Sequence, residues 1–516
     1  MVAAGIFLSR IAGLVRQRVF AHYFATSDAA DAFSAGFRIP NLLQNLFGEG
    51  ALSASFIPVY AGLRAKGDQE EARRVAGAIA GLLGLVIAVV VLVGIGASPL
   101  LVDLIAPGFE GEKRDLTIQL VRILFPGAGL LVLSAWCLGI LNSHRRFFLS
   151  YAAPIIWNAS IITFLLVFGP GRTQVRLAEW AAWGSVAGSV LQVAVQLPTV
   201  LQALGRLRLS LSARSSNVIS VVRNFVPAFL SRGVVQISAY VDEILASLLP
   251  SGAVAAMGYA QALYTLPVSL FGMSVSAAEL PAMSSIVGDE ATVSSYLRDR
   301  LNSGLRQIAY FVIPSAMAFA ALGHVIASAL YQSGRFSQHD ADYVWGILAG
   351  SAVGLLASTL GRLYASTYYA LRDTRTPLRY AILRVGLTIG LGYLFAFPLP
   401  GLVGLAPKWG AAGLTASAGI AGWVEFALLR RSLNRRLGPT GLDLPLTWKL
   451  WASAGMAAAS GWGIYLLVSR VHPIARAAAV LAVYGLVYLL ITRALRIPQA
   501  AALIGRVGRR GRGPVP

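Results

Sequence analysis

Cysteine, histidine and charged residues are all scarce in this sequence, and each scarcity excludes a class of protein. Only 13% of the 516 residues are charged, whereas a soluble protein carries about 25%. The single cysteine, Cys137, excludes a disulfide or a thiolate metal site within one chain, and its apolar surroundings predict a small core residue. The five histidines are scattered and form no His-Glu-x-x-His motif. The sequence is therefore atypical of a soluble protein or a zinc enzyme.

Other signatures of enzymes and ATP-driven pumps are also missing. The sequence has no glycine-rich phosphate-binding loop with a lysine, and no aspartate-rich pair that would hold Mg²⁺ for polyprenyl chemistry. No loop between apolar spans is long enough to be a nucleotide-binding domain. We therefore predict that the chain is not an enzyme and uses no cofactor or metal. An intramembrane enzyme acting on polyprenyl phosphates is the weakest alternative.

Hydrophobic residues make up 56% of the sequence and recur in stretches that are long enough to span a bilayer. The sequence predicts an all-α polytopic membrane protein with about 14 transmembrane helices. The expected spans are 2–22, 30–62, 74–98, 116–142, 149–169, 178–203, 219–249, 253–285, 304–330, 341–366, 376–399, 408–432, 446–468 and 473–495.

The net charge of +21 arises because 43 lysines and arginines face only 22 acidic residues. These basic residues lie in short loops between apolar spans, where they set topology and contact anionic lipid, so nucleic acid is not an expected partner. Loops after even-numbered spans are the more basic, as at Arg145 and Arg146, which places both termini in the cytoplasm. We expect a monomer in the cell membrane, surrounded by membrane lipids.

The sequence repeats itself at an offset of roughly 220 residues, in the same order in both halves. Residues 7–10 (FLSR) recur as 229–232, and the Gly-Asp pair at 67–68 recurs at 288–289. Because an even number of spans separates the copies, both have the same orientation in the membrane, as in transporters with two parallel lobes. The predicted parts are an N-lobe at 1–205, a C-lobe at 206–436, two extra helices at 437–497 and a basic cytoplasmic tail at 498–516.

The apolar run at 37–60 is interrupted by prolines and glycines, among them Pro40 and Gly48, and it carries Arg38 and Glu49. At membrane depth such breaks are tolerated only inside protein or beside a water-filled cavity. Ionisable side chains in such a segment indicate a functional site. We predict a helix bent at its glycines that lines the polar cavity of a transporter.

Arg10 on the first span has its repeat counterpart in Arg232 on the seventh. Two guanidinium groups facing one cavity repel each other unless an anion joins them, and a guanidinium binds phosphate bidentately. The pair therefore predicts a substrate that carries phosphate. The alternative is a local ion pair for each arginine. The candidate partners are Asp28, Asp31 or Glu49 for Arg10, and Asp242 or Glu243 for Arg232.

Asp242 and Glu243 are adjacent, so only one of them can face the interior of the helix bundle. A carboxylate at membrane depth is a candidate for binding a proton or Na⁺ and coupling transport to an ion gradient. A salt bridge to Arg232, about three helical turns away, is the alternative. Further charged residues on later spans are candidate cavity residues or internal ion pairs. They are Arg362, Arg384 and Glu425.

Several short motifs, spread along the chain, together form a pattern that can be compared with known families. They are Ser9-Arg10 with Arg16, then residues 31–33 (DAF), 38–43 (RIPNLL), 47–53 (FGEGALS), 106–109 (APGF) and 369–377 (YALRDTRTP). In the last of these, Asp373 is expected to cap the turn before Pro377. The set resembles the MurJ (MviN) family of lipid II flippases over nearly the whole chain.

The resemblance implies the two-lobed fold of the multidrug/oligosaccharidyl-lipid/polysaccharide exporter superfamily, with two extra C-terminal helices forming a groove for a polyprenyl tail. It also implies movement of lipid II, the lipid-linked peptidoglycan precursor, from the cytoplasmic to the outer leaflet by alternating access. Membrane potential or a Na⁺ or H⁺ gradient would drive this step in cell-wall biosynthesis. An exporter of another polyprenyl-diphosphate-linked glycan is the main alternative. An exporter of small cations is disfavoured, because it would need acidic residues between its lobes.

The resemblance also assigns residues to the site. Ser9, Arg10 and Arg16 match cavity positions of the family, Asp31 and Glu49 match acidic positions, and Asp242 resembles the seventh-helix aspartate of the family's sodium site. With Arg38 and Arg232, which are expected to add positive charge, these residues form the predicted substrate and coupling site. The sequence departs from the family pattern at four positions that are often charged there. These are Gln17, Gln44, Gln261 and Ala262.

Overall fold

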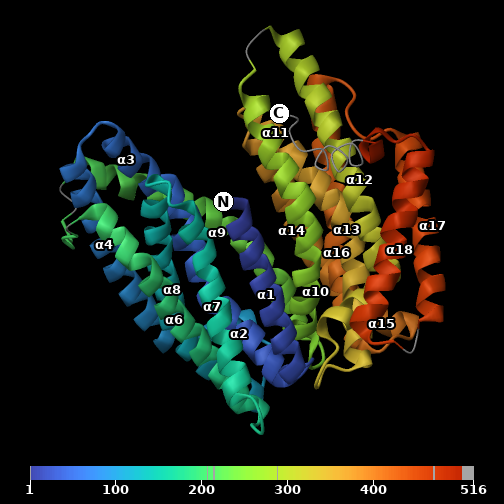
Figure 1. Cartoon of the computed structure of the whole chain (residues 1–516), viewed down its shortest axis with the longest axis horizontal. Helices are drawn as coiled ribbons and strands as arrows, with labels where there is room; N and C mark the ends of the chain where they lie inside the picture. Colours follow the sequence, from blue (N-terminus) through green and yellow to red (C-terminus); the bar gives the residue numbers. More distant parts are fainter. Residues whose placement is uncertain (1, 206, 213–214, 287–288, 469–470, 502–516) are drawn as a thin grey trace, which may run out of the picture. The chain divides into compact units, whose positions relative to one another are not determined.

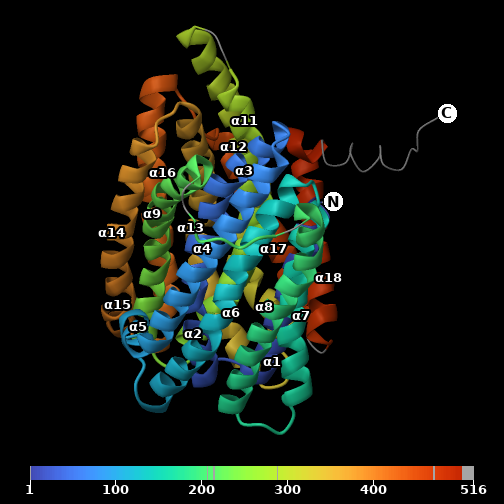
Figure 2. The same cartoon turned by 90° about the vertical axis from the view of Figure 1, so that its left-hand side faces the viewer.

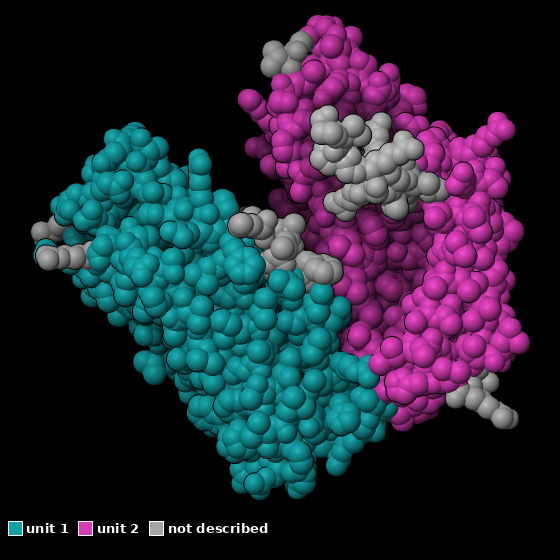
Figure 3. All heavy atoms as spheres, in the orientation of Figure 1, with its two compact units in different colours: residues 1–255, 333–336 teal, residues 256–332, 337–516 magenta. Residues whose placement is uncertain are grey.

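The computed structural model describes residues 2–205, 207–212, 215–286, 289–468 and 471–501, and within these ranges it contains helices and no strand. The chain divides into two compact units (Figure 3). Unit 1 comprises residues 1–255 and 333–336, and unit 2 comprises residues 256–332 and 337–516.

Unit 1 is a bundle in which α4, α6, α7 and α8 run side by side (Figure 1 and Figure 2). Its α9 packs on α2, η1 and α3. The elements of this unit are α1 (Val2–Phe24), α2 (Asp28–Leu46), η1 (Phe47–Leu52), α3 (Ser53–Ala65), α4 (Gln69–Gly96), α5 (Ser98–Ile105), α6 (Gly111–Ser143), α7 (Phe147–Phe168), α8 (Gln174–Leu204) and α9 (Ser216–Ser247).

In unit 2, α13 packs between α12 and α16, while α17 and α18 pack on each other and on α12. The first of its elements, α10, begins in unit 1. The elements are α10 (Ala253–Pro267), η2 (Val268–Met273), α11 (Ser274–Ser284), α12 (Glu290–Tyr331), α13 (Gln338–Ala370), α14 (Arg375–Ala396), α15 (Pro398–Val403), η3 (Pro407–Trp409), α16 (Gly410–Leu437), α17 (Leu444–Leu467) and α18 (Pro473–Ala494).

Every predicted span coincides with a helix or with a helix broken by a short π-helical turn, which confirms the all-α polytopic fold. Ten of the described helical segments are long and apolar enough to cross a membrane. α1 is not among them, and it carries Arg10, Arg16 and Arg18. Charge of this kind is costly in lipid, so a helix that carries it indicates a function beyond anchoring.

The internal repeat has a structural counterpart in two π-helical breaks of equal length. η1 begins at Phe47 and η2 at Val268, an offset of 221 residues, and α4 and α12 begin at the same offset, at Gln69 and Glu290. Inside η1, Gly48 has non-helical backbone angles (φ −78°, ψ −116°). The predicted bend at the glycines of this span is therefore confirmed. Single π-turns of this kind occur frequently at functional sites.

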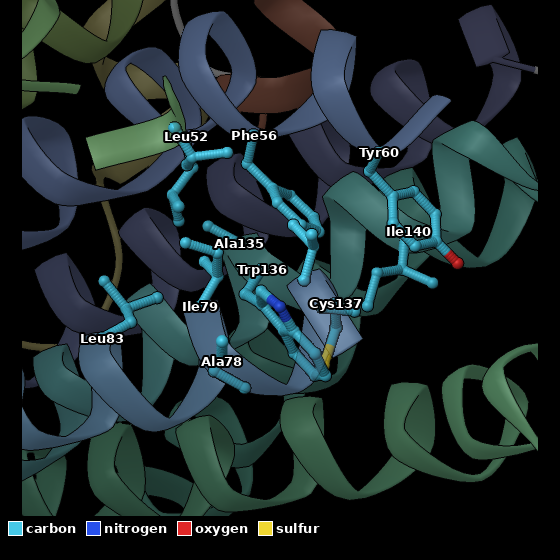
Figure 4. Close-up of a cluster of buried hydrophobic side chains, with 14 of the residues drawn as sticks. Leu52, Phe56, Tyr60, Ala78, Ile79, Leu83, Ala135, Trp136, Cys137 and Ile140 are labelled. Atoms are coloured by element: carbon cyan, nitrogen blue, oxygen red, sulfur yellow. The ribbon is translucent and has the colours of Figure 1, made fainter. Parts of the chain in front are cut away.

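The break in unit 1 rests on a buried apolar cluster shared by α3, α4 and α6 (Figure 4). Phe56 is fully buried there beside Trp136, and Cys137 is 1% exposed. Cys137 is thus the core residue that the sequence predicts. On the other side of the break, Phe47 contacts Phe229 of α9 with ring centroids 4.9 Å apart. The bend is held by packing on both sides.

The predicted cap at Asp373 is also confirmed. Its carboxylate accepts hydrogen bonds from the backbone N–H of Arg375 (3.1 Å) and Thr376 (3.0 Å) at the start of α14. The Arg436 guanidinium lies 2.8 Å away. The Thr376 N–H, together with the Arg436 charge, lowers the pKa of Asp373 below its ordinary value.

Replacing Asp373 by alanine is expected to lower the free energy of unfolding of unit 2 by about 1 kcal/mol at pH 7, because the cap is lost. A depressed pKa stabilises the fold above the unfolded-state value of about 4 and ceases to do so as pH falls through the folded-state value. The difference between wild type and variant in thermal unfolding should therefore shrink below about pH 4. Asp373→Asn keeps the cap and is the matched control. A difference in melting temperature between wild type and Asp373→Ala that stays the same at acid pH would contradict the role of the ionised Asp373 carboxylate as a cap.

Candidate functional site

Arg16 of α1 lies against two aromatic side chains of neighbouring helices. Its guanidinium carbon lies 4.9 Å from the ring centroid of Trp157 on α7 and 5.8 Å from that of Phe37 on α2. No carboxylate among the described residues is within ion-pair distance of it. Stacking on aromatic rings fixes the guanidinium plane without neutralising its charge. Arg16 thus carries a charge that no described carboxylate neutralises, and its predicted contact with substrate stays a prediction.

Ser9 and Arg10 lie one to two turns earlier on α1, where the helix is less covered. Arg10 is exposed and Ser9 is half-buried. Arg10 has no ion-pair partner among the described residues, so its pairs with Asp28 and Asp31 are not formed, while the pair with Glu49, whose side chain is not described, stays a prediction. A Cβ on Gly13 would meet no atom within 4 Å. The rest of unit 1 therefore does not pack closely on α1 at Gly13, and the predicted contacts of Ser9 and Arg10 with substrate stay predictions.

Asp31, by contrast, is saturated by contacts within unit 1. It is 1% exposed. One carboxylate oxygen accepts from the Lys113 ammonium of α6 (2.6 Å) and from the Gly252 N–H (2.7 Å), and the other accepts from the Ala255 N–H (2.8 Å). Asp31 therefore joins the start of α2 to the start of α6 and to the first turn of α10. Its predicted contact with substrate stays a prediction.

The backbone around Asp31 shows why these segments approach so closely. Gly252 has φ +90°, and a Cβ there would lie 2.4 Å from the Thr26 carbonyl oxygen. Only glycine fits this turn without strain. Nearby, Asp28 accepts a hydrogen bond from the Ser251 hydroxyl (2.6 Å) and lies 3.0 Å from the Lys113 ammonium. The two aspartates thus share one lysine.

Arg38 forms an ion pair with Glu243 of α9, and the Arg38 carbonyl accepts a hydrogen bond from the Tyr240 hydroxyl (3.0 Å). The Glu243 side chain is 3% exposed, whereas that of Arg38 is 37% exposed. Of the adjacent acids, Glu243 is thus the one that faces the bundle interior, and its cation comes from α2. Asp242 is half-buried beside it. Its role in ion coupling stays a prediction.

Removing Arg38 alone would leave the buried Glu243 carboxylate without its cation, which is costly, whereas replacing both partners by apolar residues is close to neutral. We expect Arg38→Met and Glu243→Met each to lower the melting temperature of the purified protein, and the double variant to recover most of the loss. The coupling energy should be about 1–3 kcal/mol. Additive losses would contradict the pairing. A stable double variant that fails to support growth would show that this pair has a role beyond folding.

Two predicted residues, Glu49 and Arg232, have side chains that lie outside the described residues. Their backbones are in η1 and α9. The predicted pairing of Arg10 with Arg232 therefore stays a prediction.

Sequence reasoning missed Lys113 as a site residue and Trp157 as the support for Arg16. Lys113 lies 82 residues from Asp31 and its ammonium also lies 4.3 Å from the centroid of the Phe109 ring. A signal existed, because Lys113 is one of few basic residues in the loops after odd-numbered spans. Trp157 could not be recognised in this way, because an aromatic residue in an apolar span is common and does not point to a contact with Arg16.

The family model described as lipid II flippase MurJ matches residues 20–489, which is most of the chain. The chain belongs to the MurJ family.

Relatives from several bacteria agree with this membership. A probable lipid II flippase MurJ of Rhizobium tropici is 32% identical over 435 residues, covering 83% of this chain and 79% of that protein. A lipid II flippase MurJ of Burkholderia cenocepacia is 31% identical over 441 residues, covering 83% of this chain and 82% of that protein. The chain is therefore a multi-pass membrane protein of a transporter family.

Solved structures agree on the fold. A structure of lipid II flippase MurJ in an inward closed conformation has a TM-score of 0.78 at 24% identity and covers 96% of this chain and 98% of that one. An inward-facing multidrug resistance MATE family transporter of the MOP superfamily has a TM-score of 0.63 at 16% identity, covering 82% and 95%. The MurJ fold and its MOP superfamily relatives thus match the predicted architecture.

Within this MurJ-family fold, unit 2 holds the remaining charged residues of the spans. Arg384 of α14 forms an ion pair with Glu425 of α16 at 3.1 Å, which settles these two as an internal pair. Arg362 of α13 is exposed, one turn after Ser358, whose hydroxyl contacts the Tyr264 hydroxyl at 2.8 Å. Arg362 remains a candidate cavity residue of unit 2.

Proposed function

We propose that this protein is a flippase that moves lipid II from the cytoplasmic to the outer leaflet of the cell membrane by alternating access. The family match over residues 20–489 is the observation that carries the proposal. Arg16 supports it chemically, because a guanidinium stacked on Trp157 and free of a carboxylate suits a diphosphate. The division into two compact units supports alternating access, which requires two bodies that move against each other.

The lobes of this transporter are proposed to be residues 1–205 and 206–436, followed by two extra helices at 437–497 and a basic tail at 498–516. Both termini would lie in the cytoplasm, because loops after even-numbered spans are the more basic. The transport step would be driven by membrane potential or by a Na⁺ or H⁺ gradient, with Asp242 as the coupling residue. The protein would act as a monomer, and lipid II would be its partner.

A cell depleted of its resident lipid II flippase tests the proposal. The wild-type chain should restore growth, whereas a variant combining Arg10→Ala with Arg232→Ala should not, at equal protein level. Failure of the wild type would contradict lipid II transport. Normal growth of the double variant would contradict the role of the two arginines while leaving the transport function intact.

A second candidate is export of another polyprenyl-diphosphate-linked glycan. The observation that favours it is the loss of charge at Gln44, Gln261 and Ala262, positions that are often charged in the family. Complementation and analysis of accumulated lipid-linked glycans separate the two. Under the second candidate, growth of the depleted cell would not be restored, and accumulation of a different lipid-linked glycan would follow loss of this protein in its own host.

A further inference from the structure

A groove on the C-terminal half of α16 in unit 2 has no part in the proposed transport of lipid II. It has a volume of about 480 Å³. One end is lined by Trp423 and Phe426, and the other by Arg430, Arg431 and Arg435. Their spacings of three, four, one and four residues place them on one broad face of the helix. The groove therefore changes from aromatic to strongly basic along a single helix.

The distance over which the groove changes from aromatic to basic suits the interface between the hydrocarbon and the headgroups of a membrane. Twelve residues separate Trp423 from Arg435, which corresponds to about 18 Å along the helix. Trp423 is 37% exposed, and its indole N–H donates to the Val353 carbonyl at 2.8 Å. Tryptophan is typical of the boundary between hydrocarbon and headgroups. The basic end of the groove would then lie at headgroup level.

The positive charge in the groove is not compensated by the protein. No carboxylate among the described residues lies within ion-pair distance of Arg430, Arg431 or Arg435. Arg431 and Arg435 are four residues apart, a spacing at which like charges repel. Arg436, the next residue, differs from them, because it pairs with Asp373 at 2.8 Å and lies 5.7 Å from the centroid of the Tyr368 ring.

The loop that follows α16 holds the groove in shape. The Arg430 Nε donates to the Thr440 carbonyl at 2.9 Å, and the Asn434 side-chain oxygen accepts from the Thr440 N–H at 3.0 Å. The Thr440 hydroxyl in turn contacts the Tyr364 hydroxyl at 2.9 Å. Arg430 is thus held by its Nε bond and by contact with the Gly441 backbone, which leaves Arg431, Arg435 and the Asn434 amide nitrogen to meet a ligand. Side chains ordered in advance lose little entropy on binding.

We propose that this groove is a binding site for the headgroup of an anionic membrane phospholipid. The lipid phosphate would accept hydrogen bonds from the arginines, which bind phosphate oxygens in their planar fork geometry. The first carbons of the acyl chains would lie against Trp423 and Phe426. Basic residues at the membrane surface attract anionic lipid in this way. The site is separate from the residues proposed to contact the transported substrate.

Titration of the purified full-length protein with phosphatidylglycerol tests the site. Phosphatidylcholine of the same chain length is the neutral control, and bound lipid is counted by native mass spectrometry. The variant combines Arg431→Gln with Arg435→Gln, and it spares Arg430, which is anchored to the loop. At about 1 kcal/mol for each arginine, phosphatidylglycerol should bind the double variant about thirtyfold more weakly than wild type. Arg436→Gln, whose arginine is already paired, should bind as wild type.

Three results would overturn the proposal. The first is equal binding of phosphatidylglycerol by wild type and the double variant, with matching melting temperatures in the absence of added lipid. The second is equal binding of the neutral lipid. The third is displacement of phosphatidylglycerol by inorganic phosphate at the same concentration, which would indicate a simple anion site. None of these results bears on lipid II transport, so each proposal can fail independently.

Discussion

Replacing Arg16 by alanine is expected to abolish growth of cells that depend on this protein for lipid II transport. The guanidinium lies against the neighbouring rings of Trp157 and Phe37, whose centroids are 5.7 Å apart, and has no described carboxylate partner. Its contribution to folding is therefore limited to packing, whereas a substrate diphosphate would lose charge-assisted hydrogen bonds. Hydrogen bonds to charged groups contribute about 1.5–3 kcal/mol each, so transport should fall at least about tenfold. Growth curves after depletion of the resident flippase measure the effect.

Two companion variants make the result specific. Arg16→Lys keeps the charge but loses the planar fork and the stacking on Trp157, so it should support growth only partly. Arg176→Ala removes a largely exposed arginine of the same unit, which pairs with Glu179 at 2.8 Å, and it should grow as wild type. Normal growth of Arg16→Ala at wild-type protein level would show that α1 does not hold the substrate phosphate.

Replacing Asp31 by alanine is expected to destabilise unit 1 by about 3–5 kcal/mol, because it leaves a partly buried ammonium and two backbone N–H groups without their acceptor. The affected groups are the Lys113 ammonium and the N–H groups of Gly252 and Ala255. Since single domains are only marginally stable, the variant should give little folded protein. Thermal unfolding in detergent and yield after size-exclusion chromatography measure the loss.

The neighbouring Asp28→Asn variant is the matched control. Asp28 contacts the same Lys113 at 3.0 Å, but its side chain is 63% exposed, so its loss should cost less than about 1 kcal/mol. Equal losses for the two variants would contradict the central position of Asp31 in the network. A stable but inactive Asp31→Ala protein would instead favour the predicted contact with substrate.

The features that the sequence predicted well are those that depend on residues close together in the chain. Glycines and prolines within an apolar run predicted the bend near Gly48, and the structure has a π-helical break there. The spans were located in the same way, because hydropathy depends on neighbouring residues alone. The repeat could be predicted because both copies kept short motifs at one offset, and the two π-helical breaks keep that offset too.

Partners of the charged residues could not be predicted, because they come from distant parts of the chain. For Glu243, the sequence offered Arg232 on the same helix, about three turns away. The structure pairs Glu243 with Arg38, which lies on another helix. Asp31 likewise meets Lys113 and two backbone N–H groups, none of which lies near it in sequence. Every residue except proline has a backbone N–H, so the sequence cannot show which of them bonds to Asp31, and only the structure identifies them.

The most direct test of the account is to measure where lipid II lies in cells that rely on this protein alone. A lipid II-modifying reagent that cannot cross the membrane is added to such cells before and after the protein is depleted. The account predicts that the fraction of lipid II accessible from outside falls sharply on depletion, while the total amount rises. An accessible fraction that is unchanged by depletion would contradict the proposal that this protein moves lipid II across the membrane.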